Sequence, residues 1–159
     1  MAYAPIPLSA TYSFIDVQAA LTSPTASIIM SENGIAREGI RISMLEEKDR
    51  MQIGADGTGM HSLNASNAGR ITVSLLKESP VNAQLSTLYN YQKMTAANWG
   101  NIQISVTNPV TGDNITAIEG AFAKRPDIIY DVDGPMIAWE FNFVSIEEIL
   151  GNGYQATNV

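Results

Sequence analysis

The sequence predicts a mainly β protein of the α+β class, an antiparallel β-sandwich or barrel with one flanking α-helix. The first observation is strict alternation of apolar and polar residues, which is typical of strands with one buried and one solvent-facing side. It is clearest in three apolar series: Ile71, Val73 and Leu75; Ile102, Ile104 and Val106; Ile137, Trp139, Phe141 and Phe143. The second observation is that helical spacing of apolar residues occurs convincingly in one segment, which begins at Ser79. The third is the order of elements, strands then a helix then strands, which favours antiparallel pairing.

The first 45 residues are predicted to form an extended arm and three short strands. Pro5 and Pro7 make residues 1–11 the arm. Ser23-Pro24 is a turn signal, and Asn33-Gly34 predicts a tight hairpin turn. The strands separated by these turns are expected at residues 12–21, 26–30 and 37–45.

Residues 46–69 are predicted to be a long connection. A run of charged residues, 46–50, is followed by Met51 and Ile53, which continue the strand pattern. Residues 54–69 then contain four glycines and little periodicity. An irregular connection of this length is usually functional or ordered by a partner. We therefore expect this segment to bind something.

The second half is predicted to contain a strand, the helix and three further strands. Ser79 is placed to cap the helix, Pro80 suits its first turn, and the helix is expected to end near residues 98–100. The strands are expected at residues 70–77, 101–107, 114–123 and 136–146, and residues 151–159 form a C-terminal tail.

Length and composition limit the function classes. A chain of 159 residues is expected to form one domain, residues 1–159, and its lack of cysteine excludes disulfides and a cysteine nucleophile. The net charge of −7 disfavours gripping nucleic acid, whereas an acidic wall would let DNA pass without adsorbing. No apolar run approaches the roughly 20 residues that span a bilayer, so we expect a soluble protein made in the cytoplasm, without a membrane anchor.

No catalytic, cofactor-binding or metal site is predicted. His61 is the only histidine, and its neighbour Ser62 would point away from it in an extended segment. Residues 131–134 resemble the start of a calcium loop but lack its later ligands, and residues 54–59 lack the Lys-Ser/Thr of a phosphate loop. The carboxylates of residues 46–49 alternate with cations, as on a solvated hairpin. These patterns favour a structural protein rather than an enzyme.

Several segments, taken in order, resemble a family of phage structural proteins. They are YSFIDV (residues 12–17), IGADGTGMHS (53–62), SPVNAQL (79–85), ANWG (97–100), AFAK (121–124) and WEF (139–141). The resemblance is to tail tube proteins of contractile-tailed phages, which are similar in fold to type VI secretion tube proteins. It implies that six copies form a ring, join their sheets into one ring-wide β-barrel, and stack into a tube inside a sheath. The implied partners are other copies, the sheath, baseplate or initiator and tape-measure proteins, and phage DNA in transient, non-specific passage. The implied location is the phage tail of the virion, with synthesis in the host cytoplasm.

The resemblance also implies two sets of assembly residues. The candidates for ring stacking lie in the 46–69 connection: Glu46, Glu47, Asp49, Asp56, Thr58, His61 and Asn64. The candidates for the lumen are polar residues on the solvent-facing side of strands: Arg41, Ser43, Arg50, Gln52, Thr72, Ser74, Glu140 and Asn142.

Two alternative functions remain open from the sequence. One is another ring-forming virion protein, namely a head–tail connector, a tail terminator or a capsid decoration protein. The other, from a different class, is a small-ligand-binding β-barrel or enzyme, which would stay monomeric and contain a lined pocket.

Overall fold

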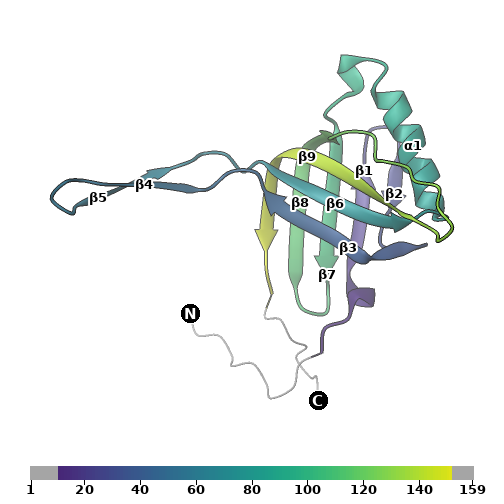
Figure 1. Ribbon diagram of the computed structural model, residues 1–159, viewed down its shortest axis with the longest axis horizontal. Helices are drawn as coiled ribbons and strands as arrows, with labels where there is room; N and C mark the ends of the chain where they lie inside the picture. The colour runs from purple at the N-terminus through teal and green to yellow at the C-terminus, as the bar shows by residue number, and fades with distance from the viewer. Residues whose placement is uncertain (1–10, 152–159) are drawn as a thin grey trace.

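A computed structural model of the protein describes residues 11–151, and most of its strand residues lie in one antiparallel sheet (Figure 1). Seven strands follow one another in the order β2-β1-β7-β8-β9-β6-β3. Their bounds are β1 Gln18–Thr22, β2 Ser27–Ile29, β3 Ile35–Met44, β6 Gly69–Leu76, β7 Ile102–Asn108, β8 Asp113–Phe122 and β9 Met136–Ile149. Separate from this sheet, β4 (Asp49–Ile53) pairs with β5 (Gly59–Leu63), and the helix α1 spans Pro80–Gln92. The predicted arm 1–11 and tail 151–159 lie outside the described residues, apart from Thr11 and Gly151.

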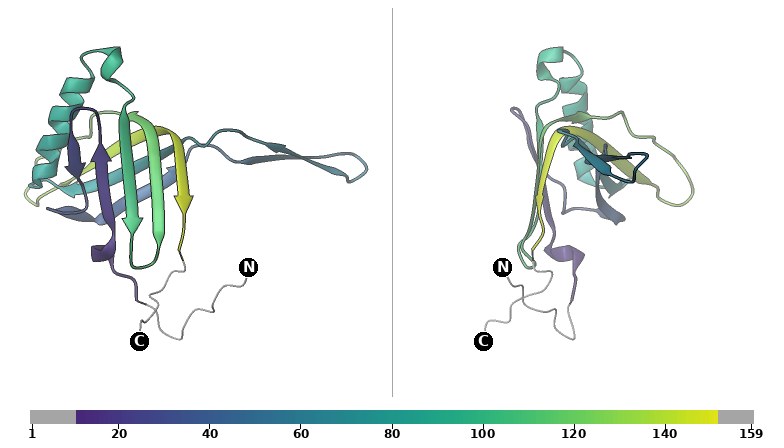
Figure 2. Two further views of the ribbon diagram at one scale, coloured as in Figure 1. Left: turned by 180° about the vertical axis from the view of Figure 1, so that it is seen from behind. Right: turned by 90° about the vertical axis from the view of Figure 1, so that its left-hand side faces the viewer.

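The seven-stranded sheet curls into a half-barrel around a hydrophobic core, and α1 packs along one side of it (Figures 1 and 2). The core side carries the apolar residues of the predicted alternation. Ile71, Leu75 and Phe141 are fully buried, and the polar residues between them lie on the other face. The predicted mainly β class with a flanking helix is therefore confirmed.

A backbone irregularity in β8 bends the sheet. Glu119 has a left-handed φ of 53°, and the pairing of β8 with β7 shifts register beside it. As a result Ala117 and Phe122 are both buried although they are five positions apart, a spacing that places two residues on opposite faces of a regular strand. An extra residue in one strand bends it and increases its twist. Gly120 lies at this bend, where a Cβ atom would be 2.2 Å from the ring of Phe143.

The start of α1 follows the predicted capping chemistry. Ser79 accepts a hydrogen bond from the backbone N–H of Val81 at 3.3 Å, and Pro80 is the first helical residue. On the side toward the sheet, the indole N–H of Trp139 donates to Asn82 Oδ1 at 2.9 Å. This bond fixes the helix to β9.

The end of α1 comes earlier than predicted. The helix stops at Gln92 and Thr95 is extended, so the expected helical end at residues 98–100 is wrong. A short 3₁₀ turn, η2 (Ala96–Asn98), stands there instead. None of the helices in the described part of the chain is long and apolar enough to cross a membrane.

Two N-terminal predictions are wrong in detail. The predicted strand 12–21 begins as a 3₁₀ turn, η1 (Phe14–Asp16), and only its second half pairs as β1. Asn33 and Gly34 have positive φ angles of 59° and 96°, as a tight turn requires. They do not close a hairpin, however, because β2 pairs with β1 whereas β3 pairs with β6 at the far edge of the sheet. The strand that β3 pairs with is decided by long-range contacts, and the local chemistry of the turn does not encode them.

Candidate assembly surfaces

The predicted irregular connection contains a β-hairpin that projects from the body (Figure 1). The expectation of no regular structure across residues 54–69 is wrong, because β5 pairs with β4 over five residue pairs from Asp49↔Leu63 to Ile53↔Gly59. Its turn is closed by Asp56, whose Oδ1 accepts from the Thr58 hydroxyl at 2.7 Å and the Thr58 N–H at 3.1 Å. These hydrogen bonds lower the pKa of the Asp56 carboxyl, the side-chain bond contributing most.

The hairpin has one apolar and one polar face. Pairing places Met51, Ile53 and Leu63 on one face, where they are 56%, 61% and 81% exposed. Asp49 and His61 lie between them, with Asp49 Oδ2 2.8 Å from His61 Nδ1. The opposite face carries Arg50, Gln52, Met60 and Ser62. We call the first of these the apolar hairpin face.

Side chains tie the two legs of the hairpin together at its base. Lys48 donates to Asn67 Oδ1 at 2.7 Å and to the carbonyl of Ser66 at 3.0 Å. Asn64 donates to Glu46 Oε2 and to the carbonyl of Glu47, both at 3.2 Å. The seven candidate stacking residues thus occupy the base, one face and the turn of a single projecting element.

Six of the eight candidate lumen residues share one face of the seven-stranded sheet. Arg41 pairs with Thr72, which pairs with Glu140, and Ser43 and Asn142 flank Arg70 in the next row. Ser74 continues that face along β6. The other two candidates, Arg50 and Gln52, lie on the hairpin, away from this sheet.

Arg70 also lies on this polar face, although it is not among the lumen residues expected from the sequence. Its Nε donates to Asn142 Oδ1 at 2.9 Å, and another guanidinium nitrogen lies 3.8 Å from Glu140 Oε2. The sequence signal that could have placed Arg70 on this face is its position at the start of a strand with alternating apolar and polar residues. The cross-strand contacts fix the charged groups on this face.

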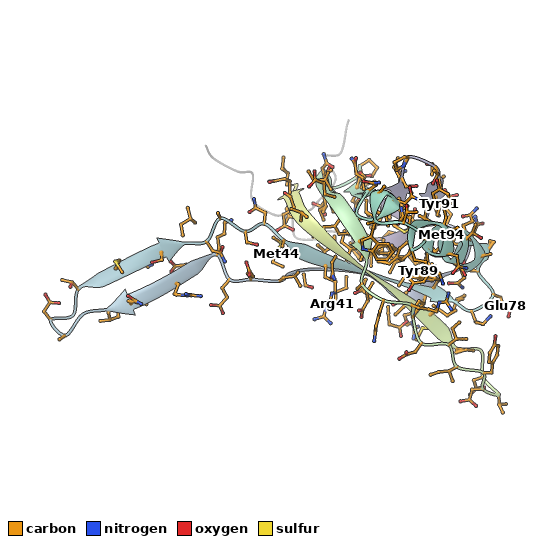
Figure 3. All side chains as sticks on the ribbon, turned by 90° about the horizontal axis from the view of Figure 1, so that it is seen from above. Arg41, Met44, Glu78, Tyr89, Tyr91 and Met94 are labelled. Atoms are coloured by element: carbon orange, nitrogen blue, oxygen red, sulfur yellow. The ribbon has the colours of Figure 1, made fainter. Side chains whose placement is uncertain are left out.

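The sheet has one long edge that no other strand of residues 11–151 covers, the outer edge of β3 (Figure 1). A bulge near Gly39, which has φ 63°, interrupts the pairing of β3 with β6, so regular pairing runs from Ile40 to Met44. Figure 3 shows Arg41 and Met44 on this strand as it leads toward the hairpin. The opposite edge, β2, has only three residues and lies beside α1. An unpaired edge presents backbone N–H and C=O groups to a further strand.

The residues weighed for chemistry do not assemble into a reactive site. His61 and Ser62 lie on opposite faces of β5, as expected for neighbours in a strand. Asp131 and Asp133 lie in an exposed loop. Within residues 11–151, no three His, Cys, Asp or Glu side chains are grouped so as to hold a metal ion.

Comparison with known proteins identifies the family of this chain, which has a curled sheet with a free edge and a projecting hairpin. A family model described as the bacteriophage PhiTE tail tube protein matches residues 9–151. The chain belongs to this tail tube family. This tail tube protein is therefore a structural protein of the phage tail. No curated protein matches it.

Two solved structures are similar to this tail tube protein. A chain of the six-fold symmetrised cryo-EM structure of the anti-feeding prophage baseplate has 9% identity and a TM-score of 0.53, covering 92% of this chain and 97% of that chain. A chain of the cryo-EM structure of the anti-feeding prophage tube-terminating cap has 14% identity and a TM-score of 0.47, covering 95% of each. The first of these likenesses shows a shared fold.

Proposed function

We propose that this protein is the subunit of the inner tail tube of a contractile-tailed phage, in which hexameric rings stack into a conduit for DNA ejection. The observation that carries the proposal is the match to the tail tube family over residues 9–151. Residues 1–159 form one domain. The protein is made in the host cytoplasm and assembled into the tail. The protein has a structural role without catalysis, and its partners are further copies, the sheath, the baseplate or initiator and the tape-measure protein.

The free edge of β3 supports closure into rings. An exposed strand edge is an aggregation hazard unless a partner occupies it. When each copy offers its edge to the next copy around an axis, pairing continues until the ring closes and no edge is left. In this proposal, the Ile40–Met44 stretch of one copy pairs with an edge of the next copy's sheet, which creates the ring-wide β-barrel.

The projecting hairpin supports ring stacking. Its apolar face exposes the large side chains of Met51, Ile53 and Leu63 around the Asp49–His61 pair, and exposed apolar side chains gathered on one face are typical of a contact site. The hairpin is too narrow to bury that face within itself, because its two strands have no second layer against them. In the tube, a neighbouring copy covers it.

The charge of the chain supports passage of DNA without adsorption. Six copies carry 6 × −7 = −42 formal charges per ring. A wall with excess negative charge repels phosphates and lets the duplex slide. In this proposal, the shared polar face of β3, β6 and β9 lines the bore. The charges named on that face are Arg41, Arg70 and Glu140, so the repulsion comes from the net charge of the whole ring and not from this face. The contacts of Arg70 with Glu140 and Asn142 hold its guanidinium on the face.

Size-exclusion chromatography and negative-stain electron microscopy of the purified protein test this function. The expected result is a hollow tube that is open at both ends and grows with protein concentration. A single closed ring would contradict the proposal and indicate a connector, terminator or decoration protein. A stable monomer at all concentrations would contradict it in favour of a ligand-binding barrel or enzyme.

A further inference from the structure

Three cations and several aromatic groups gather near the C-terminal end of α1. The Nζ of Lys93 lies 5.5 Å and the guanidinium carbon of Arg125 lies 5.2 Å from the ring centroid of Tyr89. Arg125 also donates to Asn90 Oδ1 at 2.9 Å, and Lys124 precedes it in the chain. All three cations are exposed, and they are three of only nine Lys and Arg residues in a chain of net charge −7. We call Lys93, Lys124 and Arg125 the basic end.

The basic end lies beside exposed apolar side chains. Met94 follows Lys93 and is 75% exposed, and the partly exposed Trp99 packs edge-to-face on Tyr89 with ring centroids 6.2 Å apart. Figure 3 labels Tyr89 and Met94, which both lie on the side of the molecule that carries α1. A surface that combines cations with aromatic rings and a flexible thioether suits a partner with carboxylates and aliphatic or aromatic side chains.

The same chain exposes a loop of that composition, residues 127–134, which we call the acidic loop. Its carboxylates are Asp127, Asp131 and Asp133, and it contains no cation. Between them it exposes four large apolar side chains, of which Val132 is 99% exposed; they are Ile128, Ile129, Tyr130 and Val132.

The acidic loop starts two residues after Arg125 of the basic end and returns to the body beside the start of α1. The backbone N–H of Lys77, just before α1, donates to the carbonyl of Pro135 at 3.1 Å, and the Lys77 Nζ is 5.6 Å from the centroid of the Tyr130 ring. Arg125, in contrast, contacts Asn90 near the other end of the helix. The segment from 125 to 135 therefore connects the two ends of α1, and between these contacts it bows away from the helix, as the right-hand view of Figure 2 shows. In residues 11–151, none of the six charged side chains of the two surfaces forms an ion pair within 4 Å.

We propose that the acidic loop of one copy docks on the basic end of the next copy. This contact is head-to-tail, because two different surfaces meet, and such a contact propagates along an array instead of closing a two-fold dimer. The exposed apolar side chains of the loop would lie against Met94 and Trp99, while the carboxylates meet the three cations. The inference rests on the proposed self-assembly and adds a contact that neither the β3 edge nor the hairpin supplies.

A charge-swap experiment tests this contact. One variant carries Asp127→Lys, Asp131→Lys and Asp133→Lys, and a second carries Lys93→Glu, Lys124→Glu and Arg125→Glu. Each should raise the critical concentration for tube assembly at least about tenfold, since three attractive pairs become repulsive. A chain that carries all six changes restores opposite charges across the contact, and it should assemble within about threefold of the unmodified protein.

A matched control separates pairing from net charge. Glu119→Lys, Glu147→Lys and Glu148→Lys change three exposed carboxylates of β8 and β9, so they shift the net charge by the same amount as the loop variant. Added to the basic-end variant, they should not restore assembly. Circular dichroism and thermal unfolding of the subunits check that each variant folds.

The inference is overturned if either folded single-surface variant assembles at the unmodified critical concentration. It is equally overturned if the chain with all six changes folds but does not regain tube assembly. Recovery of assembly by the control combination would overturn it as well. Failure of the proposed function itself looks different, because the unmodified protein would then form no tubes at all.

Discussion

Replacing the apolar hairpin face with threonines is expected to weaken assembly about 100-fold without unfolding the subunit. The changes are Met51→Thr, Ile53→Thr and Leu63→Thr, and threonine keeps the preference for strand. Fully burying such an aliphatic side chain stabilises by about 1.5–3 kcal/mol. More than half of each side chain is still exposed in the subunit, and threonine retains part of the burial, which leaves about 1 kcal/mol per site. Three sites give about 3 kcal/mol, and about 1.4 kcal/mol corresponds to a factor of ten in the association constant.

The assay is the critical concentration for tube formation, measured by pelleting and checked by negative-stain microscopy. The matched control is Gln52→Thr, which changes the opposite face of the same strand and should leave the critical concentration unchanged. Urea unfolding of the subunit should shift by no more than about 0.5 kcal/mol per site, because the three side chains are exposed. An unchanged critical concentration in the triple variant would refute a contact through this face.

Three further predictions concern the subunit itself. Gly120→Ala should destabilise folding by about 1–3 kcal/mol in urea, because the new methyl overlaps a core ring, whereas Gly134→Ala, with nothing within 4 Å, should have little effect. Ser79→Ala should cost about 1 kcal/mol in the same assay by removing the cap of α1, and no loss would show that the cap is dispensable. The Asp56 carboxyl should titrate below its ordinary pKa in NMR, and Thr58→Val should raise that pKa. Because the folded-state pKa is the lower one, the turn stabilisation is present above the unfolded-state pKa and is lost as the pH falls through the folded value.

The strands that bury one face were predictable from the sequence. Along β6 and β9 the core imposes its pattern directly, so Ile71, Val73 and Phe141 point inward as their spacing indicates. The start of α1 was equally predictable, since Ser79 and Pro80 act through the nearest backbone groups. Local chemistry and burial against one core were sufficient in both cases.

The hairpin, the placement of Arg50 and Gln52, and the basic end were not predictable in the same way. The hairpin residues face no core, and the turn at Asp56 depends on a side-chain bond to Thr58 that periodicity does not report. Arg50 and Gln52 were grouped with Arg41 because they alternate with the apolar Met51 and Ile53. Alternation does not report which sheet a strand joins, and β3 ends at Met44. The basic end joins residues about 30 positions apart in the chain, so only the tertiary fold reveals it.

The pairing of the β3 edge is the point on which tube formation rests, and electron cryomicroscopy of the assembled protein addresses it most directly. The backbone of residues 40–44 is expected to be hydrogen-bonded to a strand of an adjacent copy around a central channel. An assembly in which that edge faces solvent, or is covered by the termini of its own chain, would contradict it.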